Sequence, residues 1–252
     1  MKKDNPLYEP IGSDQDKYVP GVTISCVAFC FESGSLKLLL CKHQEHAEWV
    51  LPGGPISQDE DADQAARRIL KNKIGVKRPF MNQFHFFGDK DLTDLTAVAG
   101  MQDMGKPAFP RLINLAYYSL VRNEEIKEPR SDGGELRWFR LGDCSCIHVD
   151  HKKIIDTCIL AIRRQVGFLP IGYGLLPEKF TMPELRIIYE TILERSIDRR
   201  NFQRKILSVG YVKPLHETRK IGGHKSPNLY TFDKKKCEEA VRLGIQLMSN
   251  NL

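Results

Sequence analysis

The first β-branched or apolar runs of the chain lie at 22–31 and 36–43. Runs of this kind predict β-strands, and the Glu-Ser-Gly-Ser segment at 32–35 between them predicts a hairpin turn. The glycine pair at 53–54 ends a third short apolar stretch and predicts a loop. Later runs of the same type predict strands at Phe84–Phe87, Leu112–Val121 and Leu136–Leu141.

Two further segments have apolar residues at helical spacing. Residues 61–74 follow this period, and Gly75 stands where a glycine commonly ends a helix. Residues 151–166 form a second amphipathic pattern, and we expect Asp150 to be its N-cap rather than a catalytic group. The first part of the chain therefore mixes strands with helices.

The helical period returns in the C-terminal part of the chain. Thr181 and Glu184 are spaced as a capping box, with a proline in the first turn of the predicted helix. Asp198 can cap a second helix that runs to Val209, and Gly210 is placed to end it. The apolar residues expected to face inward are Leu185, Ile188, Ile192, Phe202, Ile206 and Val209.

Two short strand-like segments follow these helices. Residues 211–215 and 228–232 flank a basic loop that contains glycines, and they predict a two-stranded wing. Helix, turn, helix and hairpin in this order are typical of a winged helix-turn-helix, which binds DNA.

A stretch with three glycines and two prolines at 167–177 predicts a domain boundary. Residues 89–110 lack a period and are expected to form a surface loop. We expect a flexible leader at 1–18, a first domain at 19–170, a linker at 171–178 and a second domain at 179–252.

The composition is that of a folded protein rather than a disordered or fibrous one. Of the 252 residues, 41% are hydrophobic and 28% are charged. No apolar run reaches the ~18 residues of a membrane-spanning helix, and the N-terminus lacks the apolar segment of a secretion signal. The seven cysteines form no CxxC pair and no zinc-type spacing, which favours the reducing cytoplasm.

The net charge of +6 is concentrated in one part of the chain. Between Ser196 and Lys236, 11 lysines and arginines accompany three acidic residues, which gives this segment a charge of +8 and leaves −2 elsewhere. A solvated basic face is one explanation, but such an asymmetry favours binding to nucleic acid.

A 23-residue segment resembles the Nudix box. The positions that fit its pattern are Gly54, Glu60, Arg68, Leu70, Gly75 and Val76. A loop followed by a capped helix also occurs outside this family, so a purely structural interpretation stays open.

Three positions depart from the box where the family has metal-binding carboxylates. Ile69, Asn72 and Lys73 occupy them, and their spacing places all three on one face of the predicted helix. Mg²⁺ requires oxygen ligands, and a lysine repels it, so the resemblance implies a non-catalytic Nudix domain without a metal. The acidic residues that begin this helix suit the positive end of its dipole better than a replacement metal site; they are Asp59, Glu60, Asp61 and Asp63.

Together the two parts of the chain are similar to the Nudix-related bacterial transcriptional regulators, over about residues 19–236. This resemblance implies an α+β protein in which a Nudix-like α/β/α sandwich with a mixed sheet precedes a winged helix-turn-helix domain. Relatives in the family sense ADP-ribose or arabinose.

The second helix and the wing supply the candidate DNA contacts. Arginine can bind guanine edges and Asn or Gln adenine edges, whereas lysines suit phosphates. Arg195 fits either a position in a loop or a contact with a DNA phosphate. The candidate DNA-binding residues are Arg199, Arg200, Asn201, Gln203, Arg204, Lys205, Lys213, Arg219, Lys220 and Lys225.

A pocket over the box is the candidate effector site. Arg68 can instead pair with Glu60 and hold the loop, and any of the aromatic residues can belong to the core. The candidate effector-binding residues are Trp49, Gly53, Gly54, Arg68, Phe87, Arg111 and Tyr117.

We therefore expect a repressor or other regulator of carbohydrate metabolism that binds palindromic duplex DNA as a homodimer. A sugar, sugar phosphate or ADP-ribose-like effector is expected to control it, with no cofactor and no membrane partner. A Nudix hydrolase of nucleoside diphosphate derivatives with non-standard metal ligands is the alternative. An adaptor that uses its basic part for RNA or protein is a third possibility.

Overall fold

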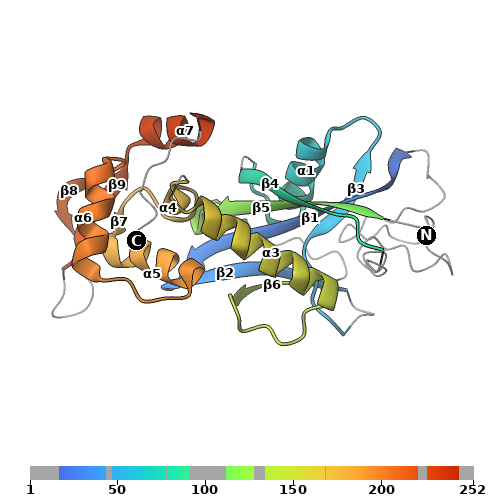
Figure 1. Ribbon diagram of the computed structural model, residues 1–252, viewed down its shortest axis with the longest axis horizontal. Coiled ribbons are helices and arrows are strands. Elements are labelled where there is room, and N and C mark those ends of the chain that lie inside the picture. The colour runs from blue at the N-terminus through green and yellow to red at the C-terminus, as the bar shows by residue number, and fades with distance from the viewer. Residues whose placement is uncertain are drawn as a thin grey trace. The chain divides into compact units, whose positions relative to one another are not determined.

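The computed structural model describes residues 17–43, 47–77, 79–90, 112–127, 134–167, 169–220 and 226–243. These form two compact units (Figure 1). The first holds most residues up to Cys158, and the second holds those from Ile159 onward together with 30–36 and 122–124. Most of the expected leader and of the expected 89–110 loop lies outside the described residues. No described helix is long and apolar enough to cross a membrane.

The first unit is built on a sheet whose strand order is β4-β5-β1-β2-β6, with β3 paired to β1. Every predicted strand is present, and β1 and β4 begin four residues earlier than the apolar pattern indicated. The glycine pair at 53–54, which predicted a loop, instead begins strand β3 and pairs with β1. The strands are β1 (Tyr18–Glu32), β2 (Ser35–His43), β3 (Gly53–Ser57), β4 (Phe80–Phe87), β5 (Ile113–Val121) and β6 (Gly134–Arg140). A 3₁₀ turn, η3 (Asn123–Glu125), follows β5.

The predicted hairpin joins β1 to β2. Ser33 and Gly34 at its tip have φ values of 51° and 73°. Positive φ at both central residues is the geometry of a tight hairpin turn that suits the twist of two strands. The Gly-containing break in the apolar pattern therefore predicted this turn correctly.

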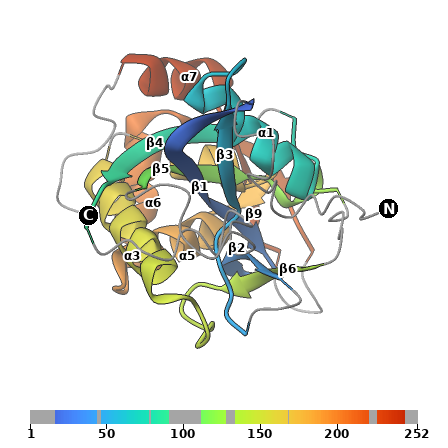
Figure 2. The ribbon, with the colours of Figure 1, turned by 90° about the vertical axis from the view of Figure 1, so that its right-hand side faces the viewer.

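Helices α1 (Ala62–Ile74) and α3 (Val149–Gln165) cover the two faces of this sheet (Figure 2). Successive residues of a strand point to opposite faces. The Tyr117 hydroxyl of β5 donates a hydrogen bond to Asp63 of α1, whereas Tyr118 lies near Cys158 of α3. The α/β/α sandwich is confirmed.

The start of α3 corrects one prediction. The helix begins at Val149, so Asp150 lies in its first turn and is not its N-cap. The carbonyl of His148 accepts from Lys152 N at 2.9 Å, and His148 Nδ1 accepts from Asp150 N at 3.4 Å. The His148 imidazole therefore takes the capping position that the sequence pattern gave to a carboxylate.

The second unit is a winged helix (Figure 1). Its three-stranded sheet has the order β7-β9-β8. Both predicted helices and both wing strands are present, whereas β7, α4 and α7 were not predicted. The elements are α4 (Ile171–Leu175), β7 (Phe180–Thr181), α5 (Met182–Leu193), α6 (Arg199–Val209), β8 (Val212–Thr218), β9 (Asn228–Phe232) and α7 (Lys234–Leu243).

The ends of α5 and α6 follow the sequence pattern. Thr181 and Glu184 form the predicted capping box, and Asp198 accepts a hydrogen bond from Asn201 N at 2.8 Å. Gly210 ends α6 in the left-handed conformation, with φ 78°. These contacts satisfy backbone groups at helix ends that otherwise lack partners.

The residues expected to form a linker, 171–178, include the short helix α4, which packs inside the second unit. A Cβ placed on Gly172 would lie 2.3 Å from Leu185 Cδ1 and 2.9 Å from Phe232 Cζ. The glycine in this segment is therefore required for close packing rather than for flexibility. The domain limits given above stay a prediction.

Candidate nucleic-acid interface and effector site

Helix α6 has one buried and one exposed side. Phe202 and Ile206 are fully buried, as predicted, whereas Val209 is only half-buried. Because α-helical residues advance by about 100° each, Arg200 and Arg204 lie opposite the buried pair. Both arginines are exposed. The outer face of α6 is therefore cationic.

The neighbours of these arginines hold part of this face in place. Arg204 Nη2 donates to Asn201 Oδ1 at 2.8 Å. Gln203 Nε2 donates to the Tyr230 hydroxyl of β9 at 3.2 Å, which ties α6 to the sheet. Arg199 is exposed at the N-terminal end of the helix.

The candidate DNA-binding residues on and after β8 differ in exposure and in their partners within the protein. Lys220 is exposed, and Lys225 lies outside the described residues. Lys213 pairs with Asp233 at 2.7 Å. Arg219 donates to Glu184 Oε1 at 2.8 Å and to the Lys179 carbonyl at 2.7 Å. Arg219 thus joins the end of β8 to the start of α5, an internal role that competes with the expected phosphate contact.

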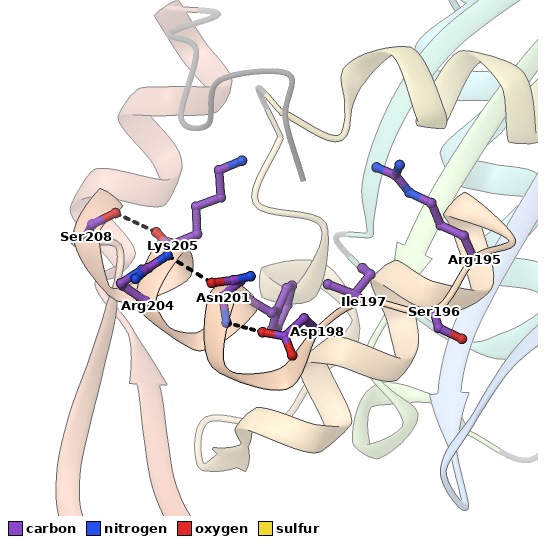
Figure 3. A pocket seen from close by; sticks show the side chains of 9 residues that line it. Arg195, Ser196, Ile197, Asp198, Asn201, Arg204, Lys205 and Ser208 are labelled. Atoms are coloured by element: carbon purple, nitrogen blue, oxygen red, sulfur yellow. Dashed lines mark hydrogen bonds between the residues drawn. The ribbon is translucent and has the colours of Figure 1, made fainter.

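Hollows lined by described residues border both flanks of α6. The larger, which we call the Arg195 hollow, has a volume of about 680 Å³. Figure 3 shows Arg195 on one side of it and Arg204 and Lys205 on the other. The residues that line it are Arg195, Ser196, Ile197, Asp198, Asn201, Phe202, Arg204, Lys205 and Ser208.

The smaller hollow, of about 220 Å³, borders the opposite flank of α6. Arg199 and Gln203 contribute from α6, and Arg186 contributes from α5. Asn228 and Tyr230 of β9 close it on the other side. The apolar patterns gave no signal for Arg186, Asn228 or Tyr230, because these residues reach α6 only when α5 and β9 pack against it in the fold.

In the Nudix-like unit, Arg68 and Glu60 form one bonded group. Arg68 Nε lies 2.9 Å from Glu60 Oε2, and its Nη2 lies 2.6 Å from Glu60 Oε1 and 2.9 Å from the Pro55 carbonyl. Ser57 N also donates to Glu60, at 2.8 Å. Burial alone would raise the pKa of Glu60, but these hydrogen bonds and the Arg68 charge outweigh it and lower that pKa. Arg68 therefore holds the β3–α1 loop, the alternative that the sequence left open.

Other acidic residues at the start of α1 also have internal partners. Asp61 caps the helix in a reciprocal capping box with Gln64. Asp63 Oδ1 accepts a hydrogen bond from the Tyr117 hydroxyl at 2.7 Å. Burial, followed by this bond and the Asp63 charge, raises the pKa of Tyr117. The acidic cluster thus stabilises the helix start and the adjoining sheet.

The three positions that depart from the box differ in exposure. Ile69 and Lys73 are both 4% exposed, whereas Asn72 is exposed. A Cβ placed on Gly54 would lie 3.7 Å from Ile69 Cδ1, so the Ile69 side chain packs against Gly54 of β3. An apolar side chain covers this strand where the family has a carboxylate.

The remaining effector candidates are mostly buried. Phe87 and Tyr117 are each 3% exposed, and Trp49 is 8% exposed. Gly53 and Gly54 are also buried, and Arg111 lies outside the described residues. Trp49 packs edge-on against Phe139 and lies under the Arg137 guanidinium, 5.4 Å from its ring centre. Sequence reasoning missed Phe139 and Arg137, which β6 brings to Trp49.

The model of the NUDIX domain matches residues 19–158, more than half of the chain. The chain belongs to the Nudix domain family. The model of the NrtR DNA-binding winged helix domain matches residues 172–232. The chain thus combines a Nudix domain with a winged helix domain, as its sequence predicted.

One relative compared by sequence and two solved structures match the chain over both its Nudix domain and its winged helix domain. The chain is 23% identical over 220 residues to the ADPR responsive transcriptional repressor NtrR of Acinetobacter baylyi, covering 84% of this chain and 82% of the relative. Among solved structures, NrtR of Shewanella oneidensis complexed with a 27mer DNA has a TM-score of 0.69 at 22% identity and covers 86% of this chain and 95% of its own. A MutT/nudix family protein of Enterococcus faecalis has a TM-score of 0.64 at 20% identity, covering 85% and 88%. These likenesses support the two-part fold.

Proposed function

We propose that the protein is a DNA-binding transcriptional repressor whose Nudix domain senses ADP-ribose or a related metabolite. The observation that carries this proposal is the cationic outer face of α6 within a winged helix. Arg200 and Arg204 are exposed there, opposite a buried core. In helix-turn-helix proteins the second helix enters the major groove, where arginine can bind guanine bidentately.

The other candidate DNA-binding residues are proposed to contact either base edges or backbone phosphates. Arg199, Asn201 and Gln203 lie at the N-terminal half of α6 and are proposed to contact base edges or the adjoining backbone. Lys205, Lys213, Lys220 and Lys225 are proposed to contact phosphates. Arg219 is proposed to position the wing through Glu184 rather than to contact DNA directly.

A homodimer on palindromic DNA is part of the same proposal. One winged helix reads a short half-site, and two copies related by a two-fold axis read an inverted repeat. The cytoplasmic location and the link to carbohydrate metabolism stay predictions from the sequence.

The effector is proposed to bind at the β3–α1 loop of the Nudix domain. The A. baylyi relative is an ADPR responsive repressor, which supports ADP-ribose over arabinose as the effector. Trp49, Gly53, Gly54, Phe87 and Arg111 are retained as candidate contacts. Arg68 and Tyr117 are proposed to hold the site in shape, because Glu60 and Asp63 bind their polar atoms.

A non-catalytic Nudix domain is supported by the α1 face itself. Ile69 packs against Gly54 of β3, and Lys73 is buried on the same helix as Ile69. An aliphatic group and an ammonium cannot hold Mg²⁺, which binds through oxygen atoms. The hydrolase alternative therefore lacks a ligand set at the family's position.

Fluorescence anisotropy of the full-length protein with duplexes from the region upstream of its own gene tests this proposal. We expect one duplex to be preferred over a scrambled one, and ADP-ribose to change its affinity by about 1–3 kcal/mol, the usual range of allosteric coupling. Arabinose is the matched comparison ligand. Equal binding of all duplexes, or hydrolysis of ADP-ribose with Mg²⁺ or Mn²⁺ above ~1 per second, would contradict it.

A further inference from the structure

Resting on the proposed function, we propose that Arg163 of α3 is the positioning residue through which effector binding in the Nudix domain changes DNA binding by α6. Arg163 lies outside the helix-turn-helix and bonds to the end of α5, where the turn towards α6 begins. It belongs neither to the DNA contacts nor to the effector contacts proposed above. The proposal therefore names the residue that couples the two sites.

Arg163 forms two bonds with the C-terminal end of α5. Its Nε donates to the Ile192 carbonyl, and its Nη2 lies 2.5 Å from Glu194 Oε1 in an ion pair. The last carbonyls of a helix have no partner within that helix. A guanidinium can bind such a carbonyl and a carboxylate at once, because its donors form a fixed fork. Arg163 therefore helps to fix where α5 ends.

Glu194 is the residue at which α5 ends and the chain turns. Its φ of 51° and ψ of 38° lie in the left-handed region, which is unfavourable for a residue other than glycine. A residue keeps such a conformation only where the surrounding contacts hold it. The ion pair with Arg163 is one of these contacts, so a movement of Arg163 bears directly on this turn.

The turn after Glu194 leads into α6. Asp198, the N-cap of α6, comes four positions after Glu194, and Figure 3 shows Ile197 and Asp198 in this turn. Ile197 N donates to Glu190 Oε1 of α5 at 2.9 Å, so the turn is bound to the helix before it. A shift at Glu194 is therefore passed to the N-terminal end of α6, where Arg200 is exposed.

The opposite end of α3 is bonded to the proposed effector site. His151 Nδ1, in the first turn, accepts from Leu51 N at 3.1 Å. His148 N, directly before the helix, donates to the carbonyl of Trp49, a proposed effector contact, at 3.0 Å. The segment 49–51 then leads into the glycine pair of β3. A ligand that moves this segment therefore moves the start of α3.

Helix α3 is continuous between these two ends and belongs to both compact units. Its residues up to Cys158 lie in the first unit and those from Ile159 in the second. Hydrogen bonds join each helical turn to the next, and the rise from His151 to Arg163 is about 18 Å. One packed element thus connects the effector segment to Arg163, as coupling between distant sites requires. Its buried residues follow one another along the helix: His151, Ile154, Ile155, Cys158, Ile159 and Ile162.

The test measures a coupling factor, which is the ratio of the dissociation constants for the preferred duplex with and without saturating ADP-ribose. Arg163→Met in the full-length protein keeps an unbranched apolar side chain and removes both bonds to α5. Arg164→Met is the matched control, because Arg164 is the next residue of α3, carries the same charge and is exposed.

The wild-type duplex affinity is expected to change by about 5- to 150-fold when ADP-ribose binds. Arg163→Met should reduce this change to less than about twofold, whereas Arg164→Met should keep the wild-type factor. Affinity for ADP-ribose without DNA should stay at the wild-type value in both variants, because neither residue contacts the ligand. Coupling is reciprocal, so the duplex should also lose its effect on ADP-ribose affinity in Arg163→Met.

Glu194→Gln tests the same contact from its other side. This variant should also lower the coupling factor, because the ion pair is lost. The double variant with Arg163→Met should lower the factor no further than Arg163→Met alone, because two residues that act as a pair are not additive.

The outcomes separate this proposal from the proposed function. If the wild type is coupled and both Arg163→Met and Glu194→Gln keep its factor, coupling through Arg163 is wrong and the proposed function stands. A lower melting temperature and weaker duplex binding at an unchanged factor would also overturn the proposal, since Arg163 would then only stabilise the fold. A wild-type protein whose duplex affinity does not respond to ADP-ribose would contradict both proposals.

Discussion

In the Nudix domain the charged residues around the β3–α1 loop bond to one another, whereas in the winged helix domain those on the outer face of α6 point to solvent. Glu60, Asp61 and Asp63 each have a partner on Arg68, Gln64 or Tyr117. Arg199 and Arg200 of α6 are exposed, and so is Lys220 after β8. A charge that is bonded internally stabilises the fold, and a charge that faces solvent remains available to a partner.

This contrast leads to different expectations for substitutions. In the Nudix domain, changes of polar residues should alter the stability of the fold more than any binding reaction. In the winged helix domain, changes on the outer face of α6 should alter DNA binding at little cost in stability.

The largest expected effect concerns His151 in the first turn of α3. The side chain is fully buried, and its Nδ1 accepts from Leu51 N at 3.1 Å. Its Nε2 has no hydrogen-bond partner within the described part of the chain. Burial, with a smaller contribution from His148, lowers the pKa of His151 from 6.5 to about 3.

The sign follows from proton uptake in the unfolded state. Below pH 6.5 the unfolded chain binds a proton at this histidine and the folded chain does not, so the free energy of unfolding falls as pH falls towards 3. The expected slope is about 1.4 kcal/mol per pH unit for one group. Urea unfolding at several pH values measures it. The control is His151→Asn, which keeps an acceptor for Leu51 N and should remove this part of the slope; equal slopes would contradict the prediction.

The second effect concerns Arg200 on the outer face of α6. Arg200→Ala should weaken binding to the preferred duplex by about 1–3 kcal/mol if the guanidinium reads a base, and should weaken a scrambled duplex much less. The melting temperature should not change, because the side chain is exposed. Lys220→Ala serves as the comparison and should weaken both duplexes alike. The same loss for both duplexes in Arg200→Ala would reassign it to the backbone.

The third effect concerns the hydrogen bond from the Tyr117 hydroxyl to Asp63. Tyr117→Phe should lower the free energy of unfolding by about 1–2 kcal/mol, because a hydrogen bond to a charged group is lost. Calorimetric titration should find the same affinity for ADP-ribose, since the ring and its packing remain. Unchanged stability with weaker ADP-ribose binding would instead return Tyr117 to the effector contacts.

The sequence predicted the parts of the fold that depend on neighbours along the chain. The hairpin tip at Ser33–Gly34 and the caps at Thr181, Asp198 and Gly210 are local signals, and all four are confirmed. The predicted N-cap of α3 was wrong because the helix begins at Val149 and His148, a residue type that the capping pattern does not favour, precedes it. Helix α4 was missed because its two glycines and the prolines that flank it, Pro170 and Pro177, indicated a linker.

The candidate site was predictable only in part, for the same reason. The exposed cations of α6 follow from the helical period, because Phe202 and Ile206 fix which side is buried. The bond from Arg219 to Glu184 joins residues 35 positions apart, and that from Leu51 to His151 joins residues 100 apart. Neither pair leaves a local pattern, so their internal roles emerge only from the fold.

The smallest expected effect concerns Asp233, whose ion pair with Lys213 competes with the phosphate contact proposed for Lys213. The hydrogen bond from Lys213 and that from the backbone of Lys236 lower the pKa of Asp233, so it is ionised at neutral pH and offsets the Lys213 charge. Asp233→Asn removes this charge and keeps an acceptor for Lys236 N at the start of α7. We expect affinity for all duplexes to rise roughly two- to fivefold at low salt, less than the ~eightfold of one full phosphate contact, and the gain to shrink as salt screens the surface. Anisotropy titrations across a salt series measure the gain, with Asp156→Asn on α3 as the control for an equal change of charge in the Nudix domain. If both variants gain equally, the net charge of the chain, not the release of Lys213, accounts for the effect.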